Sequence, residues 1–232
     1  MLSKSEILDA LKTAFPIMLG YVSIGLPCGI LEQQIGMSPL QAFLLSCIFY
    51  TGAGQFMIPG MWVAGAPIAA IIASVSAVNT RQILYSATLS KYCQNAGKWL
   101  SFFFAAGVTD ETFGVNVARF EQGGWKVSQA LLVNIFSCSC WSSANALGAF
   151  LGEMVSIPVA VGSFAMTSIF ICLLCSQKAT KTNAVVVVAT ILAVIACKLV
   201  GLSGAAIILG ALVGVAVGIL YLRKRGGAHD AR

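Results

Sequence analysis

Long stretches without charged residues dominate the hydrophobic pattern of this chain. A helix that crosses a bilayer needs about 20 mostly apolar residues. Charge-free runs of about that length or longer occupy 13–31, 127–152, 154–177 and 199–222. The run 33–80 is long enough for two spans, and Gly60, Gly65 and Pro67 mark the expected break between them.

Two shorter segments complete the predicted spans. The segment 98–119 is interrupted by Asp110 and Glu111, and 182–197 needs flanking residues such as Lys198 to reach across. We therefore expect an all-α integral membrane protein, a polytopic bundle of about eight transmembrane helices, some of them broken, with room for an internal inverted repeat.

Glycine and proline refine this picture at the two ends of the chain. Five helix-weakening residues predict that the first span is a broken helix: Pro16, Gly20, Gly25, Pro27 and Gly29. Small residues recur every four positions in the last span, which is typical of helix packing within the chain or against a partner: Ala206, Gly210, Gly214 and Gly218.

Composition excludes a soluble globule. Of the 232 residues, 58% are hydrophobic and 9% are charged, whereas soluble domains carry about 25% charged residues. We expect one transmembrane domain over 1–232, with an interfacial N-terminal segment at 1–12 and a basic cytoplasmic tail at 223–232. Ser3 and Glu6 have capping-box spacing, which predicts a short helix in the first segment, with a frayed tail as the alternative. No cleavable signal peptide is recognisable in the sequence.

The distribution of Lys and Arg predicts the orientation. With eight spans, both ends lie on one side, and most basic residues share that cytoplasmic side: Lys4, Lys12, Arg119, Lys126, Lys178, Lys181 and 223–225. Lys91 and Lys98 fall on the opposite side in this count. Either their loop tolerates them, or an early segment is re-entrant. The net charge of +6 is explained by anionic lipid headgroups and requires no nucleic acid.

Cysteine and histidine give no metal signature. Most of the eight cysteines lie in apolar runs, where they act as small apolar filler. Cys172 and Cys175 have two-residue spacing, but no second pair follows at zinc-site spacing, and the single histidine, His229, lies in the tail. We expect no metal, no cofactor and no catalytic residue.

Polar residues enter the apolar pattern at four places, and each needs a reason because a charge at the bilayer centre costs about 2.5–3.5 kcal/mol. The first place is the segment 51–56. Gly52 and Gly54 allow close approach of a backbone or a ligand, and Gln55 adds hydrogen-bonding groups. Helix packing with one interhelical hydrogen bond explains the same residues equally well.

The second place is the segment 79–85, where Arg81 and Tyr85 share a helical face. Arg81 either reaches the interface or faces inward toward a carboxylate. The third place offers that carboxylate. Asp110 and Glu111 point about 100° apart on a helix, so they line a cavity, form a structural ion pair with Arg81, or sit at an interfacial kink. The fourth place, for which packing is favoured, contains Asn134, Trp141, Ser142, Ser143 and Asn145.

Four motifs in this order resemble the AzlC family, the large subunit of bacterial branched-chain amino acid exporters: Phe15-Pro16, 50–56, 79–85 and 109–113. The resemblance implies export of valine, leucine, isoleucine or similar amino acids, driven by the proton gradient, across the bacterial cytoplasmic (inner) membrane. It also implies a small membrane subunit of the AzlD type. Many relatives carry histidine after the arginine, where this chain has Gln82, which does not titrate near neutral pH.

We therefore expect an amino acid to bind in a central cavity between the broken first helix, the segment 52–55 and the acids. The expected substrate-binding residues are Gly52, Gly54, Gln55, Asn79, Arg81 and Tyr85, and Asp110 and Glu111 are the expected proton carriers. A scaffold subunit of a larger complex is the alternative. An intramembrane enzyme is disfavoured, because the lone His229 excludes an ordinary buried Ser-His pair.

Overall fold

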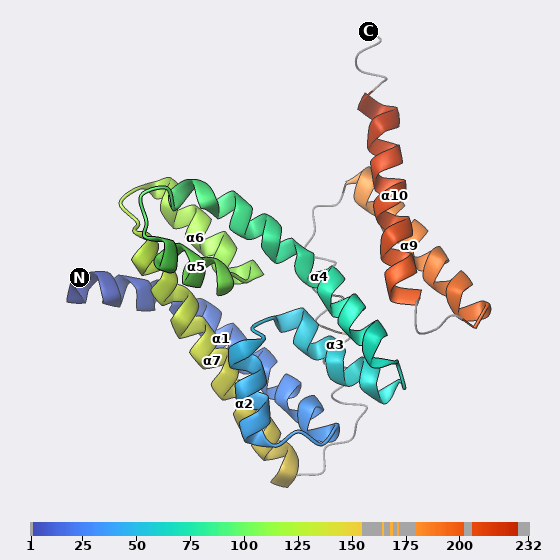
Figure 1. Ribbon diagram of the computed structural model, residues 1–232, viewed down its shortest axis with the longest axis horizontal. Helices are drawn as coiled ribbons and strands as arrows, with labels where there is room; N and C mark the ends of the chain where they lie inside the picture. Colours follow the sequence, from blue (N-terminus) through green and yellow to red (C-terminus); the bar gives the residue numbers. More distant parts are fainter. Residues whose placement is uncertain are drawn as a thin grey trace.

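A computed structural model describes residues 2–154, 164, 168, 171, 180–201 and 206–226 (Figure 1). These residues are overwhelmingly helical, and the chain is an all-α membrane protein. Four of the described helical segments are long and apolar enough to cross a bilayer: Lys4–Gln34, Ile68–Tyr92, Val127–Met154 and Lys181–Leu199. The structure thus supports fewer crossings than the eight expected. Most of the expected span 154–177, Cys172, Cys175 and the end of the tail lie outside the described residues.

The first helix, α1 (Lys4–Gln34), is continuous, so the predicted break in the first span is wrong. Pro16 and Pro27 lie inside it without ending it. Packing along α7 (Val127–Met154) accounts for this continuity. A Cβ on Gly29 would lie 1.9 Å from the Asn145 carbonyl oxygen, so the two backbones touch. The predicted capping box of Ser3 and Glu6 is confirmed at the start of α1.

Helices α1 and α7 run parallel, which defines two ends of the molecule. At one end, Lys126, just before α7, pairs with Glu6 of α1 at 2.5 Å. At the other, Gly152 of α7 packs against the Gln33 side chain of α1. Helix α4 (Ile68–Leu89) and the short η1 (Ser90–Tyr92) run in the opposite direction to α1 and α7. The contact that shows this is the stacking of Tyr92 on Phe120, near the end that contains Lys126.

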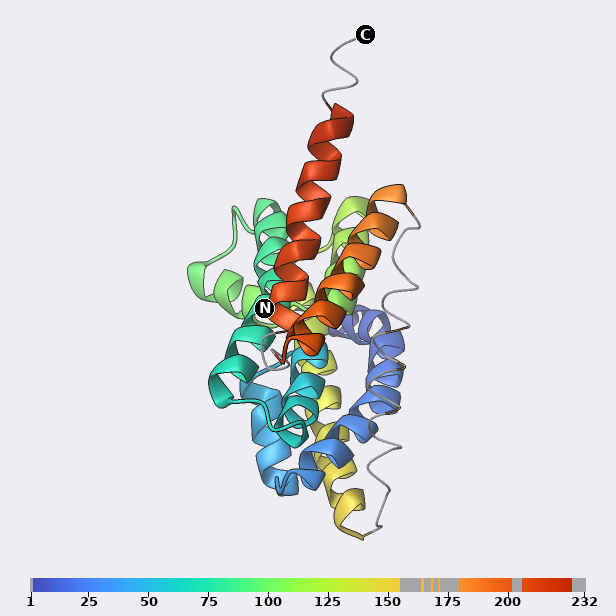
Figure 2. The same cartoon turned by 90° about the vertical axis from the view of Figure 1, so that its right-hand side faces the viewer.

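Helices α2 (Pro39–Ile48) and α3 (Gly52–Val63) form a hairpin that enters and leaves at the same end. Four residues separate the end of α1 from the start of the hairpin, and the hairpin finishes just before α4 begins. Both points lie at the Gln33 end. Figures 1 and 2 show α2 running inward and α3 returning. With 10 and 12 residues, neither helix reaches the length of about 20 residues that a crossing requires.

Helices α5 (Lys98–Ala106) and α6 (Asp110–Gln122) form a second hairpin from the opposite end. It starts shortly after η1 and ends shortly before Lys126. The segments expected as the second and fourth spans are therefore re-entrant hairpins. We call α2–α3 the first hairpin and α5–α6 the second hairpin.

These two hairpins explain the positions of Lys91 and Lys98. With the first hairpin re-entrant, both lysines lie at the same end as the start of α1. Of the two explanations that the sequence left open, the re-entrant segment is the one that the structure supports. Within residues 2–154, all Lys and Arg except Arg81 gather at this end, which we call the basic end: Lys4, Lys12, Lys91, Lys98, Arg119 and Lys126.

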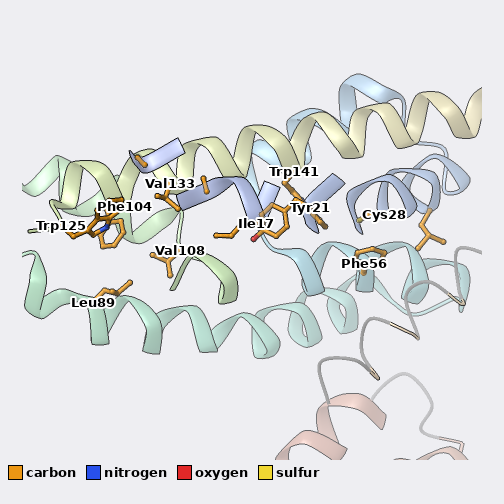
Figure 3. Close-up of a cluster of buried hydrophobic side chains, with 14 residues drawn as sticks. Ile17, Tyr21, Cys28, Phe56, Leu89, Phe104, Val108, Trp125, Val133 and Trp141 are labelled. Carbon is orange, nitrogen blue, oxygen red and sulfur yellow. The ribbon is translucent and has the colours of Figure 1, made fainter. Parts of the chain in front are cut away.

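A buried core follows the α1–α7 contact from the basic end inward (Figure 3). Trp125, Leu89 and Phe104 lie near the basic end, and Tyr21, Trp141 and Phe56 lie deeper. The core therefore passes the tips of the two hairpins and continues along α1 to Cys28 and Leu31.

Helices α9 (Lys181–Leu199) and α10 (Ala206–Gly226) form a separate antiparallel pair beside α4 (Figure 2). The small-residue stripe of α10 faces α9. A Cβ on Gly214 would lie 2.3 Å from Thr190 Oγ1, and one on Gly210 would lie 2.5 Å from Val194. The stripe is a packing surface within the chain, one of the two predicted possibilities.

Candidate functional site

A cavity of about 150 Å³ lies between the tips of the two hairpins, with walls from α1, α4 and α7. An apolar cavity of similar volume in another protein binds benzene, so this one has room for a small solute. Its apolar wall consists of Ile24, Ala53, Phe56 and Trp141. Its polar wall consists of Tyr21, Tyr50, Arg81, Gln82, Thr109, Asp110 and Glu111. Gly52 also lines it.

The tip of the second hairpin brings the two acids to the cavity. Thr109 is the N-cap of α6, and its capping box with Thr112 satisfies backbone groups at the helix start. Asp110 and Glu111 occupy the first turn, where the helix dipole favours negative charge. They therefore lie at a helix start, not in the middle of a span as the sequence suggested.

Two tyrosines and one arginine hold these acids. The Tyr21 hydroxyl donates to Glu111 Oε2 at 2.8 Å and lies 2.7 Å from Thr109 Oγ1. Arg81 forms an ion pair with Asp110 at 2.9 Å, and Tyr85 donates to the same carboxylate at 2.5 Å. The predicted inward orientation of Arg81 is thus observed. Arg81 Nε is buried and has no hydrogen-bond partner among the described residues, whereas the side chain as a whole is partly exposed at the cavity.

The tip of the first hairpin is different, because the start of α3 has no side-chain cap. Thr51, its N-cap residue, donates instead to Asn79 Oδ1 of α4 at 2.6 Å. The first N–H groups of an uncapped helix lack intrahelical partners. A Cβ on Gly52 would meet no atom within 4 Å. The start of α3 therefore presents open backbone to the cavity.

Gln55 and Gly54 are expected substrate-binding residues that do not line the cavity. Gln55 is fully buried behind the wall, where it accepts from Trp141 Nε1 at 2.9 Å and donates to Glu32 and Ser46. A Cβ on Gly54 would lie 2.9 Å from Thr51 Oγ1, so this glycine serves packing inside the hairpin. Both residues lie outside the lining of this cavity.

Asn79 and Tyr85 also do not line the cavity. Tyr85 donates to Asp110, which does line it, and Asn79 accepts from Thr51, the neighbour of the lining residues Tyr50 and Gly52. The expected site residues did not include the lining residues Tyr21, Tyr50, Thr109 and Trp141, and packing was the favoured role for Trp141. Thr109 was the one with a clear local signal, since a threonine directly before two acids is a typical N-cap. Tyr21 and Trp141 lie on long apolar helices and Tyr50 lies in the turn between α2 and α3, and only the tertiary contacts bring these three residues to the cavity.

The fold and the cavity define an all-α membrane protein with four candidate spans among its described helices and a small cavity between two short helical hairpins. The family model described as "AzlC protein" matches residues 16–155. This range includes every residue that lines the cavity. The chain belongs to the AzlC family.

Several curated proteins are similar to this chain. The inner membrane protein YgaZ of Escherichia coli K12 is 31% identical over 149 residues, which cover 63% of this chain and 61% of YgaZ. An uncharacterized membrane protein of Helicobacter pylori 26695 is 31% identical over 77% of this chain and 80% of its own length. The branched-chain amino acid transport protein AzlC of Bacillus subtilis 168 is 27% identical over 76% of this chain and 71% of its own length. No solved structure matches the chain. Family membership and the internal cavity together support a role in membrane transport.

Proposed function

We propose that this protein is a secondary transporter that exports branched-chain amino acids, such as valine, leucine or isoleucine, from the cytoplasm in exchange for protons. The observation that carries the proposal is that the tips of the two hairpins meet in one cavity and have opposite electrostatic character. The start of α3 is uncapped and suits an anion, whereas the start of α6 is capped and carries two acids.

An amino acid has the charges that these tips complement. Its carboxylate would bind the open N–H groups at Gly52 and the partly exposed guanidinium of Arg81, and its ammonium group would bind Glu111. Its aliphatic side chain would pack against Phe56 and Trp141. This arrangement leaves neither charge of the solute without a partner, which matters in a membrane interior.

Proton exchange is proposed at the same acids. Asp110 is bound by Arg81 and Tyr85, whereas the Glu111 carboxylate receives a hydrogen bond from the neutral hydroxyl of Tyr21. Glu111 can therefore hold either the ammonium group or a proton, but not both. Such competition for one carboxylate is a simple basis for antiport, with Asp110 keeping Arg81 in place.

We propose that α1 with the first hairpin and α4 with the second hairpin are related as an inverted repeat. The two helices run in opposite directions, and the two hairpins enter from opposite ends, as in transporters built from inverted repeats. The positive-inside rule makes the basic end cytoplasmic, in the inner membrane of a bacterium.

A small membrane subunit of the AzlD type is the proposed partner. Helix α9 has no buried residue among those described and exposes Val188, Ile191, Leu192 and Ile195. Lipid or a subunit must cover these side chains, and the pair α9–α10 lies apart from the cavity. A partner there could support assembly without entering the solute path.

Counterflow of labelled leucine in proteoliposomes tests the transport function. We expect uptake into leucine-loaded vesicles by the chain alone or with a copurified small subunit. Gly52→Val should abolish it, because the new side chain enters the cavity without a clash elsewhere in the described structure. Gly114→Val is the matched control, since Gly114 is exposed and outside the cavity. Absence of counterflow in both preparations, with folded protein, would favour a scaffold subunit instead.

Thiol labelling in intact cells tests the orientation. Single cysteines introduced at Lys91 and Lys98 should resist an impermeant reagent added outside, whereas one at Met37, in the loop before α2, should react. Reaction at Lys91 and Lys98 from outside would contradict the re-entrant first hairpin.

A further inference from the structure

We propose that Glu32 of α1 is a second proton-binding site, connected to the solute cavity through Gln55 and Trp141. This inference rests on the proposed transport function and extends it to a group outside the cavity. Glu32 is fully buried, with 0% of its surface exposed. One oxygen, Oε2, is buried and has no hydrogen-bond partner among the described residues.

Among the residues that the structure describes, no Lys or Arg forms an ion pair with Glu32. Gln55 of α3 donates to Oε1 at 2.6 Å, and the Cys28 thiol lies 3.9 Å from the same oxygen. Ser46 of α2 is bound to the same Gln55 amide nitrogen at 2.6 Å. On the helices packed around it, α2, α3 and α7, the described side chains of this network are neutral. Cys28 is the one other titratable group in it.

A buried carboxylate without a cation is costly, because burial removes its hydration and nothing replaces the missing charge. A proton on Oε2 would remove that charge and leave the Gln55 bond to Oε1 intact. The position of the orphan oxygen thus matches the position at which a proton can bind.

The orientation of the Gln55 amide argues for a proton over a metal cation. Trp141 Nε1 is a donor only, and it donates to Gln55 Oε1 at 2.9 Å. This bond turns the amide NH₂ group toward Glu32 and Ser46. A cation between those two oxygens would meet a donor that repels it.

The same amide connects Glu32 to the cavity. Trp141 lines the cavity, and Gln55 ties it to both α1 and α2. Gain or loss of a proton at Glu32 changes the strength of the bond to Gln55, which sits four residues after the tip of the first hairpin. Proton occupancy is thereby coupled to the position of that hairpin and of the cavity wall.

The number of protons moved per leucine tests this proposal. In proteoliposomes with an internal pH dye, Glu32→Gln, which keeps an acceptor for Gln55, should retain leucine counterflow within about twofold. The ratio of protons to leucine should fall by one. Cys28→Ala is the matched control, since it alters the same network without removing the carboxyl, and its ratio should equal that of the wild type. An unchanged ratio in Glu32→Gln, loss of its counterflow, or replacement of the proton dependence by a sodium dependence would overturn the proposal.

A spectroscopic measurement separates this proposal from the transport function. Infrared difference spectra of the purified protein at two pH values should contain a band of a buried protonated carboxyl group, and Glu32→Gln should lack it. If that band is the same in both proteins, Glu32 binds no proton. If the wild type shows no leucine counterflow, the transport function fails, but the band still decides whether Glu32 binds a proton.

Discussion

The ion pair between Arg81 and Asp110 makes a quantitative prediction for solute binding. We expect Arg81 to donate to the solute carboxylate, and a hydrogen bond to a charged group contributes about 1.5–3 kcal/mol. Loss of this bond in Arg81→Gln should weaken leucine binding by about 10- to 150-fold. Asp110→Asn should weaken binding about tenfold, because Arg81 would lose the 2.9 Å contact that orients it.

The double variant separates this reasoning from two independent effects. Once Arg81 is gone, Asp110 has no arginine to orient, so the double variant should bind leucine within about threefold of Arg81→Gln alone. Asp110→Asn thus weakens binding less in the Arg81→Gln background than in the wild type. This difference corresponds to a coupling free energy of about 1 kcal/mol, within the range for contacting residues. The pair is partly exposed, with 31% and 28% of the side chains accessible, which keeps the coupling modest.

Calorimetric titration of leucine measures the affinity of the four purified proteins: the wild type, Arg81→Gln, Asp110→Asn and the double variant. Lys91→Gln, at the exposed basic end, is the control and should bind as the wild type does. Multiplicative effects of the two substitutions would show that Asp110 does not act through Arg81. Wild-type affinity in Arg81→Gln would remove the arginine from the site.

Two further predictions concern helix packing. Gly29→Leu should abolish or strongly reduce the yield of folded protein, since even its Cβ would lie 1.9 Å from the Asn145 carbonyl oxygen. Gly20→Leu is the control and should leave the size-exclusion profile unchanged, because its Cβ meets nothing within 4 Å. Equal yields of the two variants would contradict the close α1–α7 contact. Gly214→Leu should lower the thermal stability in detergent by separating α9 from α10 at Thr190, and an unchanged melting temperature would show that this contact is not formed.

Local sequence patterns predicted the parts of the fold that depend on local physics. The Ser3 capping box, the apolar lengths of α1 and α7, and the small-residue stripe of α10 are properties of neighbouring residues. Arg81 and Asp110 could also be paired in advance, because a charge in a membrane interior needs a partner.

Tertiary packing decided the rest. Pro16 and Pro27 weaken an isolated helix, but the α7 contact holds α1 continuous. The run 33–80 has the length for two crossings, and hydropathy does not distinguish a crossing from a hairpin that turns back at its middle. The positions of Lys91 and Lys98 were the sequence features that favoured the hairpin. Glu32 lies just outside a charge-free run, so its burial between α1, α2 and α3 had no sequence signal.

The most direct test of the account is protection of the cavity by its solute. A single cysteine at Gly52, in a background without other reactive cysteines, should react with a small thiol reagent, and leucine should slow that reaction in a concentration-dependent manner. A cysteine at Gly114 should react at the same rate with and without leucine. If leucine leaves the reaction at position 52 unchanged, or slows both positions equally, the amino acid does not bind between the hairpin tips.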